Sequence, residues 1–133
     1  MTRVFLAFCA VVVAEFGLFA SISASGQTQT VKPVTVIRIA ELEIDPEQLV
    51  AYKRALSDEI TSSVREEPGV VTLCAVSVKG QPNQVRIFET YKDQAAYEAH
   101  LQSPHFKKYK DTTQGMVRSL KLIETEPIML AGK

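Results

Sequence analysis

The chain has 133 residues, a length typical of a single domain. Fifteen Lys and Arg residues balance fifteen Asp and Glu residues, so no basic surplus favours nucleic acid and no acidic tail favours a charged partner. Hydrophobic residues make up 46% of the chain and charged residues 23%, which is the composition of a globular protein rather than a disordered one.

The first 24 residues have the pattern of a secretory signal. Arg3 precedes a mostly apolar run over residues 4–20, and small residues follow that run. Glu15 interrupts the run, which is also short for a membrane span of about 20 apolar residues. We predict a signal peptide over residues 1–24 and a polar linker over residues 25–33. The protein would then be exported, periplasmic or secreted, and free of the membrane after cleavage; an uncleaved N-terminal anchor is the alternative.

Cysteine usage excludes a disulfide scaffold. Cys9 lies in the predicted signal, so Cys74 is the only cysteine of the mature part and has no internal partner. Because Cys74 lies in the middle of a predicted strand, we interpret it as a small buried hydrophobic residue.

Residues 34–130 form the predicted domain, which begins with a strand and a helix. The strand covers residues 34–44. Apolar residues occupy both of its faces in the first half and alternate with glutamates in the second half. Asp45 can cap a helix and Pro46 fits its first position. The predicted apolar stripe of this helix contains Leu49, Tyr52, Leu56, Ile60 and Val64. Glu59 falls outside that stripe, and Pro68 ends the helix.

Two strands follow, over residues 70–78 and 84–91. The turn-forming residues 79–83 between them predict an antiparallel hairpin. The second strand would place Val85, Ile87, Glu89 and Tyr91 on one face and Arg86, Phe88 and Thr90 on the other.

The last elements are a broken helix and a final strand. Asp93 can cap the first helical piece, and Pro104 breaks it. Ser103 can cap the second piece, which Gly115 ends. Residues 116–124 then read as a strand.

The resulting order, β-α-β-β-α-β, is that of a ferredoxin-like α+β fold with an antiparallel sheet and both helices on one face. Apolar residues occupy both faces of several strands. We therefore expect a second copy of the chain to cover the other sheet face, in a homodimer.

The two histidines, His100 and His105, do not have the spacing of a metal site. Helical ligand pairs are usually four residues apart, and here Pro104 breaks the helix between two histidines spaced by five. No further histidine is available to complete a zinc site, and no metal is predicted. A glycine-rich phosphate loop is also absent from the sequence.

Three segments resemble the antibiotic biosynthesis monooxygenase domain. They are Glu67-Pro68-Gly69-Val70, then Phe88-Glu89-Thr90-Tyr91-Lys92-Asp93, then the run from Ala96 to Phe106 that reads AYEAHLQSPHF. The similarity spans residues 34–123. It implies a dimeric α/β barrel of two ferredoxin-like subunits joined through their sheets, with a small pocket in each subunit between sheet and helices.

Members of this family differ in activity. Some oxidise quinols or polyketide anthrones with molecular oxygen and neither metal nor flavin; others degrade haem, isomerise a phosphorylated signalling sugar, or have no known reaction. Haem-degrading members carry a tryptophan in the segment that matches residues 99–106 and a histidine farther along. His100 and Lys110 stand at those positions here, and the chain has no tryptophan, which disfavours haem degradation.

The resemblance implies a monooxygenase without a cofactor that acts on a small aromatic or quinol-like molecule. Such an enzyme must deprotonate its substrate, and histidine titrates near neutral pH, so we predict His100 as the base. His105, Tyr91, Arg86 and Phe106 are the predicted substrate-binding residues.

Three alternatives stay open at this stage. Ser103, Pro104 and Phe106 could serve only to start and anchor a helix, with His100 filling a boundary position. The dimer could bind a small ligand or a partner without catalysis. It could also isomerise a small phosphorylated sugar, which would require a cluster of basic side chains in the pocket.

Overall fold

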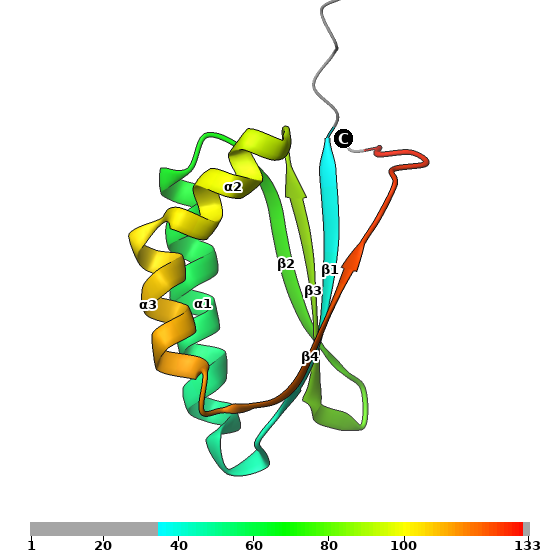
Figure 1. Cartoon of the computed structure of the whole chain (residues 1–133). Coiled ribbons are helices and arrows are strands. Elements are labelled where there is room, and N and C mark those ends of the chain that lie inside the picture. The colour runs from blue at the N-terminus through cyan, green and yellow to red at the C-terminus, as the bar shows by residue number, and fades with distance from the viewer. Residues whose placement is uncertain (1–34, 132–133) are drawn as a thin grey trace, which may run out of the picture. The chain divides into compact units, whose positions relative to one another are not determined.

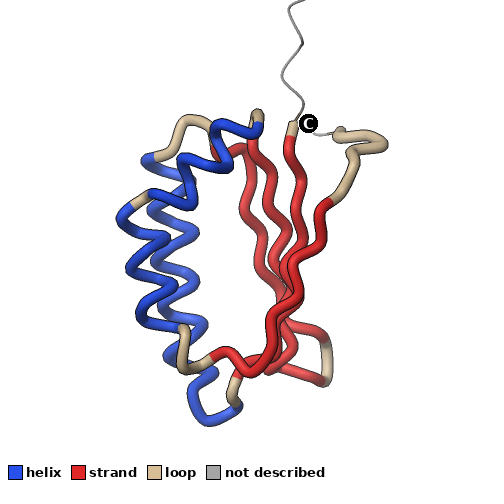
Figure 2. Tube along the Cα trace, viewed as in Figure 1, coloured by secondary structure: helices blue, strands red, loops and turns tan. Residues whose placement is uncertain are grey.

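The computed structural model describes residues 35–131 of the chain. In this part a layer of helices covers one face of a four-stranded sheet (Figure 1 and Figure 2). The predicted signal peptide over residues 1–24 and linker over residues 25–33 lie outside the described residues. Among residues 35–131, no helix is long and apolar enough to cross a lipid bilayer.

The sheet is ferredoxin-like, as predicted. Its strands are β1 (Val36–Ile44), β2 (Val70–Val78), β3 (Gln81–Tyr91) and β4 (Val117–Glu124), in the spatial order β2-β3-β1-β4. All three neighbouring pairs are antiparallel. The hairpin turn is tighter than predicted, because β3 begins at Gln81. Gly80 has a φ of 81°, a conformation that glycine adopts without strain.

The helices are α1 (Leu49–Glu66), α2 (Gln94–Gln102) and α3 (Pro104–Thr113), and a short 3-10 turn, η1 (Pro46–Gln48), precedes α1.

The predicted caps of α2 and α3 are confirmed, whereas Asp45 caps the short turn η1 and α1 itself begins without a side-chain cap. The side chain of Asp93 accepts a hydrogen bond from the backbone N–H of Ala96 at 2.8 Å, and that of Ser103 accepts one from Phe106 at 3.2 Å. Pro104 occupies the first turn of α3, where its missing N–H costs no hydrogen bond. The break between α2 and α3 is therefore encoded locally, and it fixes the positions of His100 and His105.

The predicted stripe of α1 was wrong at its C-terminal end. The buried residues of α1 are Tyr52, Leu56, Glu59 and Ser63, whereas Val64 is 53% exposed. Successive steps of four residues drift around a helix of 3.6 residues per turn, and alternating steps of four and three stay on one face. Two polar side chains consequently point inward at the end of α1.

The hydrophobic core lies between the helices and one face of the sheet. Its buried members are Ala40, Leu42, Ile44, Tyr52, Leu56, Val85, Ile87 and Tyr109. The hydroxyl groups of Tyr52 and Tyr109 form a 2.8 Å hydrogen bond, which satisfies both polar atoms inside this core.

The opposite face of the sheet is not covered by the helices (Figure 1). Phe88 and Val76 lie on it and are 43% and 45% exposed. Cys74, the cross-strand neighbour of Phe88, is exposed as well. The prediction that Cys74 is buried was therefore wrong for the protomer. A second copy as the cover of this face stays a prediction.

Candidate active site

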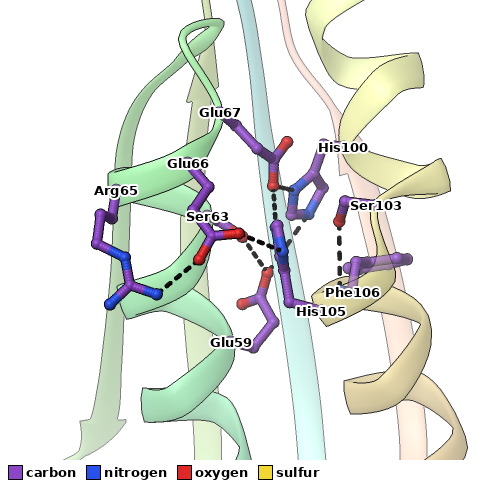
Figure 3. A network of polar contacts seen from close by, with 9 residues as sticks. All are labelled: Glu59, Ser63, Arg65, Glu66, Glu67, His100, Ser103, His105 and Phe106. Carbon is purple, nitrogen blue, oxygen red and sulfur yellow. Dashed lines mark hydrogen bonds and ion pairs between the residues drawn. The ribbon is translucent and has the colours of Figure 1, made fainter.

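A cluster of polar side chains joins the end of α1 to the junction of α2 and α3 (Figure 3). We call it the histidine cluster. Its members are Glu59 and Ser63 of α1, Glu67 directly after α1, His100 of α2 and His105 of α3.

Glu67 is the centre of the histidine cluster. Its Oε1 atom lies 3.0 Å from Nδ1 of His100 and 2.5 Å from Nε2 of His105. Both rings can donate to this carboxylate oxygen. The remaining ring nitrogens also face carboxylates: Nε2 of His100 is 3.7 Å from Oε1 of Glu59, and Nδ1 of His105 is 3.8 Å from Oε2 of Glu66. The polar atoms of the two histidines are thus directed at protein carboxylates.

Burial and hydrogen bonding set the charges of the cluster. His100 is 3% exposed. Burial acts to raise the pKa of Glu67, but hydrogen bonds from His105 and His100 outweigh it and the pKa is lowered. Burial raises the pKa of Glu59, against the hydrogen bond that Ser63 donates to it at 2.7 Å. One carboxylate therefore carries a stabilised charge, and the other is poised toward its neutral form.

Glu67, His100 and His105 are also the residues that could hold a metal ion, because one ligand atom from each lies within 4.8 Å of the others. Ligands of a tetrahedral zinc ion at 2.0–2.1 Å would be separated by about 3.3 Å. The two contacts to Glu67 Oε1, at 2.5 and 3.0 Å, are shorter than that. The arrangement fits a hydrogen-bonded network better than a metal centre.

A cavity of about 360 Å³ lies between the sheet and helices α2 and α3. We call it the sheet cavity. Its walls are mostly apolar or aromatic, and they include Leu42, Ile87, Tyr97, Leu101, Phe106, Tyr109, Leu120 and Leu122. Arg38 and Glu89 also line it, from the central strands β1 and β3. Such a composition suits a small, largely apolar ligand held by a few polar groups.

Glu89 and Arg38 are direct cross-strand neighbours in this cavity. Tyr91 donates a hydrogen bond to Oε2 of Glu89 at 3.0 Å. Burial raises the pKa of Glu89, although the Tyr91 hydrogen bond and the charges of His100 and Arg38 act in the opposite direction. The Arg38 guanidinium lies 4.5 Å from the ring centre of Tyr97 and 3.2 Å from Oε1 of Glu124. The cavity thus contains a destabilised carboxylate opposite an oriented cation.

Aromatic rings separate the histidine cluster from the sheet cavity. The ring centre of His100 lies 4.6 Å from that of Phe106 and 5.3 Å from that of Tyr91. Phe106 lines the sheet cavity, whereas His100 is not among the residues that line it. The structure therefore brings four of the predicted site residues together, but it places His100 behind the cavity wall.

Arg86 is separate from the other predicted site residues. It lies on the open face of the sheet, with Nε 3.5 Å from Oε1 of its cross-strand partner Glu41. Side chains along a strand point alternately to its two faces, so the sequence already placed Tyr91 and Arg86 on opposite faces of the sheet. That placement argued against one pocket lined by both residues. The same alternation placed Glu89 on the face of Ile87 and Tyr91. Glu89 was not among the predicted site residues, and this strand pattern was the sequence signal that could have identified it.

Comparisons with known proteins agree on the family. The sequence profile described as antibiotic biosynthesis monooxygenase matches residues 35–112. A protein of Bacteroides thetaiotaomicron assigned to the antibiotic biosynthesis monooxygenases is 46% identical, with a TM-score of 0.72 over 75% of this chain and 95% of that one.

More distant structures share the fold. A protein of Nitrosomonas europaea with the same assignment is 20% identical, with a TM-score of 0.69 over 75% of this chain and 96% of that one. Rv0793 of Mycobacterium tuberculosis is 23% identical, with a TM-score of 0.67 over 74% of this chain and 99% of that one.

No curated protein matches the chain significantly. The profile match nevertheless covers more than half of the sequence, and the ferredoxin-like topology and the 46% identical structure agree with it. This chain belongs to the antibiotic biosynthesis monooxygenase family.

Proposed function

We propose that this protein oxidises a small aromatic or quinol-like molecule with molecular oxygen, without a metal or flavin, in the sheet cavity. The observation that carries the proposal is the cavity itself. Its volume of about 360 Å³, its largely apolar and aromatic walls, and polar groups that include Glu89 and Arg38 suit a compact phenol.

Cofactor-free oxidation depends on making the substrate electron-rich. A phenol or the enol form of an anthrone loses a proton, and the resulting anion can pass one electron to oxygen. For an anthrone, the methylene carbon then becomes a carbonyl; one oxygen atom enters the product, and the other leaves as water. This balance needs no external reductant. The protein must bind the substrate, accept its proton and stabilise the anion.

The role of His100 as the base stays a prediction. Its ring is 3% exposed, and Glu67 and Glu59 face its two nitrogens. A substrate in the sheet cavity would contact His100 only if Phe106 moved aside, because the Phe106 ring packs against His100 and lines the cavity.

A second copy of the chain is the proposed cover of the open sheet face. This face exposes Phe88 and Val76 together with the Glu41–Arg86 pair, and such a patch suits a self-complementary interface. Phe88→Asp should convert a dimer to a monomer by light scattering. Val50→Asp, at an 85% exposed position on α1, is the matched control and should leave the mass unchanged. A monomeric wild-type protein would contradict the dimer.

Export remains the proposed role of residues 1–24, on the sequence pattern alone. N-terminal sequencing of protein from fractionated cells should find a start near residue 25 outside the cytoplasm. A full-length chain in the cytoplasm would contradict export.

Oxygen uptake tests the proposed function. Metal-stripped protein would be assayed with a panel of hydroquinones and anthrones, with heat-denatured protein as the control for autoxidation. We expect uptake above the control for at least one small aromatic substrate. The absence of uptake across the panel would contradict the proposal.

A binding module of the same fold is the second candidate. The observation that favours it is the pairing of both histidines with carboxylates, which leaves no unpaired base in the histidine cluster. It predicts that an aromatic ligand binds without oxygen uptake. A phosphorylated sugar is less favoured, because most of the side chains that line the sheet cavity are apolar or aromatic.

A further inference from the structure

We propose that Glu89 is the catalytic base of the sheet cavity and takes the proton from a phenolic hydroxyl of the substrate. This inference rests on the proposed function, and it names the residue that touches the substrate.

The fold directs the Glu89 side chain into the cavity. Glu89 shares a strand face with Val85, Ile87 and Tyr91, which are all buried on the helix-covered side of the sheet. A carboxylate in a row of buried apolar side chains is costly unless it is paired, so its presence there indicates a use. The only hydrogen bond to it among the described residues comes from Tyr91, at 3.0 Å to Oε2.

The second carboxylate oxygen is available to a ligand. Within residues 35–131, no buried side-chain oxygen or nitrogen lacks a hydrogen-bond partner. No protein donor contacts Oε1 of Glu89 in that part of the chain, and Glu89 lines the sheet cavity, so a ligand there can supply the missing partner. Tyr91 would therefore act as a positioning residue that holds Oε2 while Oε1 faces the substrate.

The electrostatics of the cavity suit proton transfer to Glu89. Burial raises the pKa of Glu89, which makes its carboxylate a stronger base than an exposed one. In the step, the substrate O–H bond breaks and the proton bonds to Oε1 of Glu89. The electron pair stays on the substrate oxygen, and the phenolate lies in the same cavity as the Arg38 guanidinium. Arg38 is held by Tyr97 and Glu124, so its charge is positioned before the anion forms.

Glu89→Gln tests this role with steady-state kinetics on a substrate that the wild-type protein oxidises. We expect kcat to fall by at least about 100-fold while KM changes less than about threefold, because the isosteric amide keeps the cavity shape but cannot accept the proton. The rising acid limb of the kcat–pH profile should disappear. Glu98→Gln, at an exposed glutamate of α2, is the matched control and should keep wild-type kinetics.

A binding measurement separates the inference from the proposed function. 4-Nitrophenol would be titrated with wild-type protein and Glu89→Gln at a pH below its solution pKa, and the absorbance of the phenolate recorded. We expect the wild-type protein to convert the bound probe to phenolate and the variant to bind it as the neutral phenol.

The outcomes are distinct. A wild-type protein that consumes oxygen at a rate unchanged by Glu89→Gln would overturn the inference and leave the proposed function standing. A wild-type protein that consumes no oxygen but forms phenolate only when Glu89 is present would support the inference against the proposed function. Failure to bind the probe, or equal phenolate fractions in both proteins, would overturn the role of Glu89.

Discussion

The histidine cluster and the sheet cavity lie on opposite sides of Phe106 and use charged residues differently. In the cluster, each of the two histidines contacts Glu67 at hydrogen-bond distance, and little of the surface of these three side chains is exposed. In the cavity, Glu89 has one protein partner and borders empty space. Residue types that usually signal catalysis therefore hold three helical segments together. The less conspicuous glutamate on a strand is placed to meet a ligand.

The largest expected effect is on the stability of the cluster. Glu67→Ala removes the acceptor of both histidines and leaves their buried ring nitrogens unpaired there. We expect urea unfolding to show a loss of about 2–4 kcal/mol in the free energy of unfolding. Glu66→Ala, at the neighbouring and half-exposed glutamate, should cost less than about 0.5 kcal/mol. Equal losses of unfolding free energy in the two variants would show that the histidine cluster does not stabilise the packing of the helices.

The pH dependence of stability tests the structural role of the histidine cluster in a second way. Because the folded state lowers the pKa of Glu67, this residue stabilises the fold above the usual carboxyl range, and that stability is lost as pH falls through its folded pKa. Urea midpoints measured from pH 7 to pH 3 should fall more steeply for the wild-type protein than for Glu67→Gln. Parallel curves would contradict a stabilised Glu67 charge.

The junction that positions both histidines should show a smaller effect. Ser103→Ala removes the side-chain cap of α3 and should cost about 1 kcal/mol in thermal or urea unfolding. Ser57→Ala, at an exposed position inside α1, should change stability little in either direction. If the two serine variants have the same unfolding free energy, the Ser103 cap does not stabilise the α2–α3 junction.

The smallest expected effect concerns metal ions. If the histidine cluster is a hydrogen-bonded network, chelation followed by addition of Zn²⁺ should shift the melting temperature by less than about 1 °C. A large shift that Glu67→Ala abolishes would instead establish a metal centre at Glu67, His100 and His105.

Local signals in the sequence predicted most of the fold. The caps at Asp93 and Ser103 and the break at Pro104 act within a few residues, so they could be recognised without knowledge of tertiary structure. The contacts of the site could not, because Glu67 meets His100 and His105 across 33 and 38 positions of the chain. Their proximity depends on how α1 packs beside α2 and α3.

Two of the missed polar residues, Glu59 and Glu89, were missed for different physical reasons. Glu59 was placed on the solvent face because the apolar spacing of α1 was extended by fours, and the helical period turned that line outward. Glu89 was placed on the correct strand face, but the sequence could not show that this face borders a cavity. Whether a buried carboxylate meets protein or empty space is decided only by packing.

The location of a bound ligand tests the account most directly. A crystal structure of the protein with a hydroquinone, grown and soaked without oxygen, should show the ring in the sheet cavity with a hydroxyl group within hydrogen-bond distance of Glu89. A ring bound instead in the groove between α1 and α3, which is lined by His105 and Glu59, with the sheet cavity empty, would contradict it.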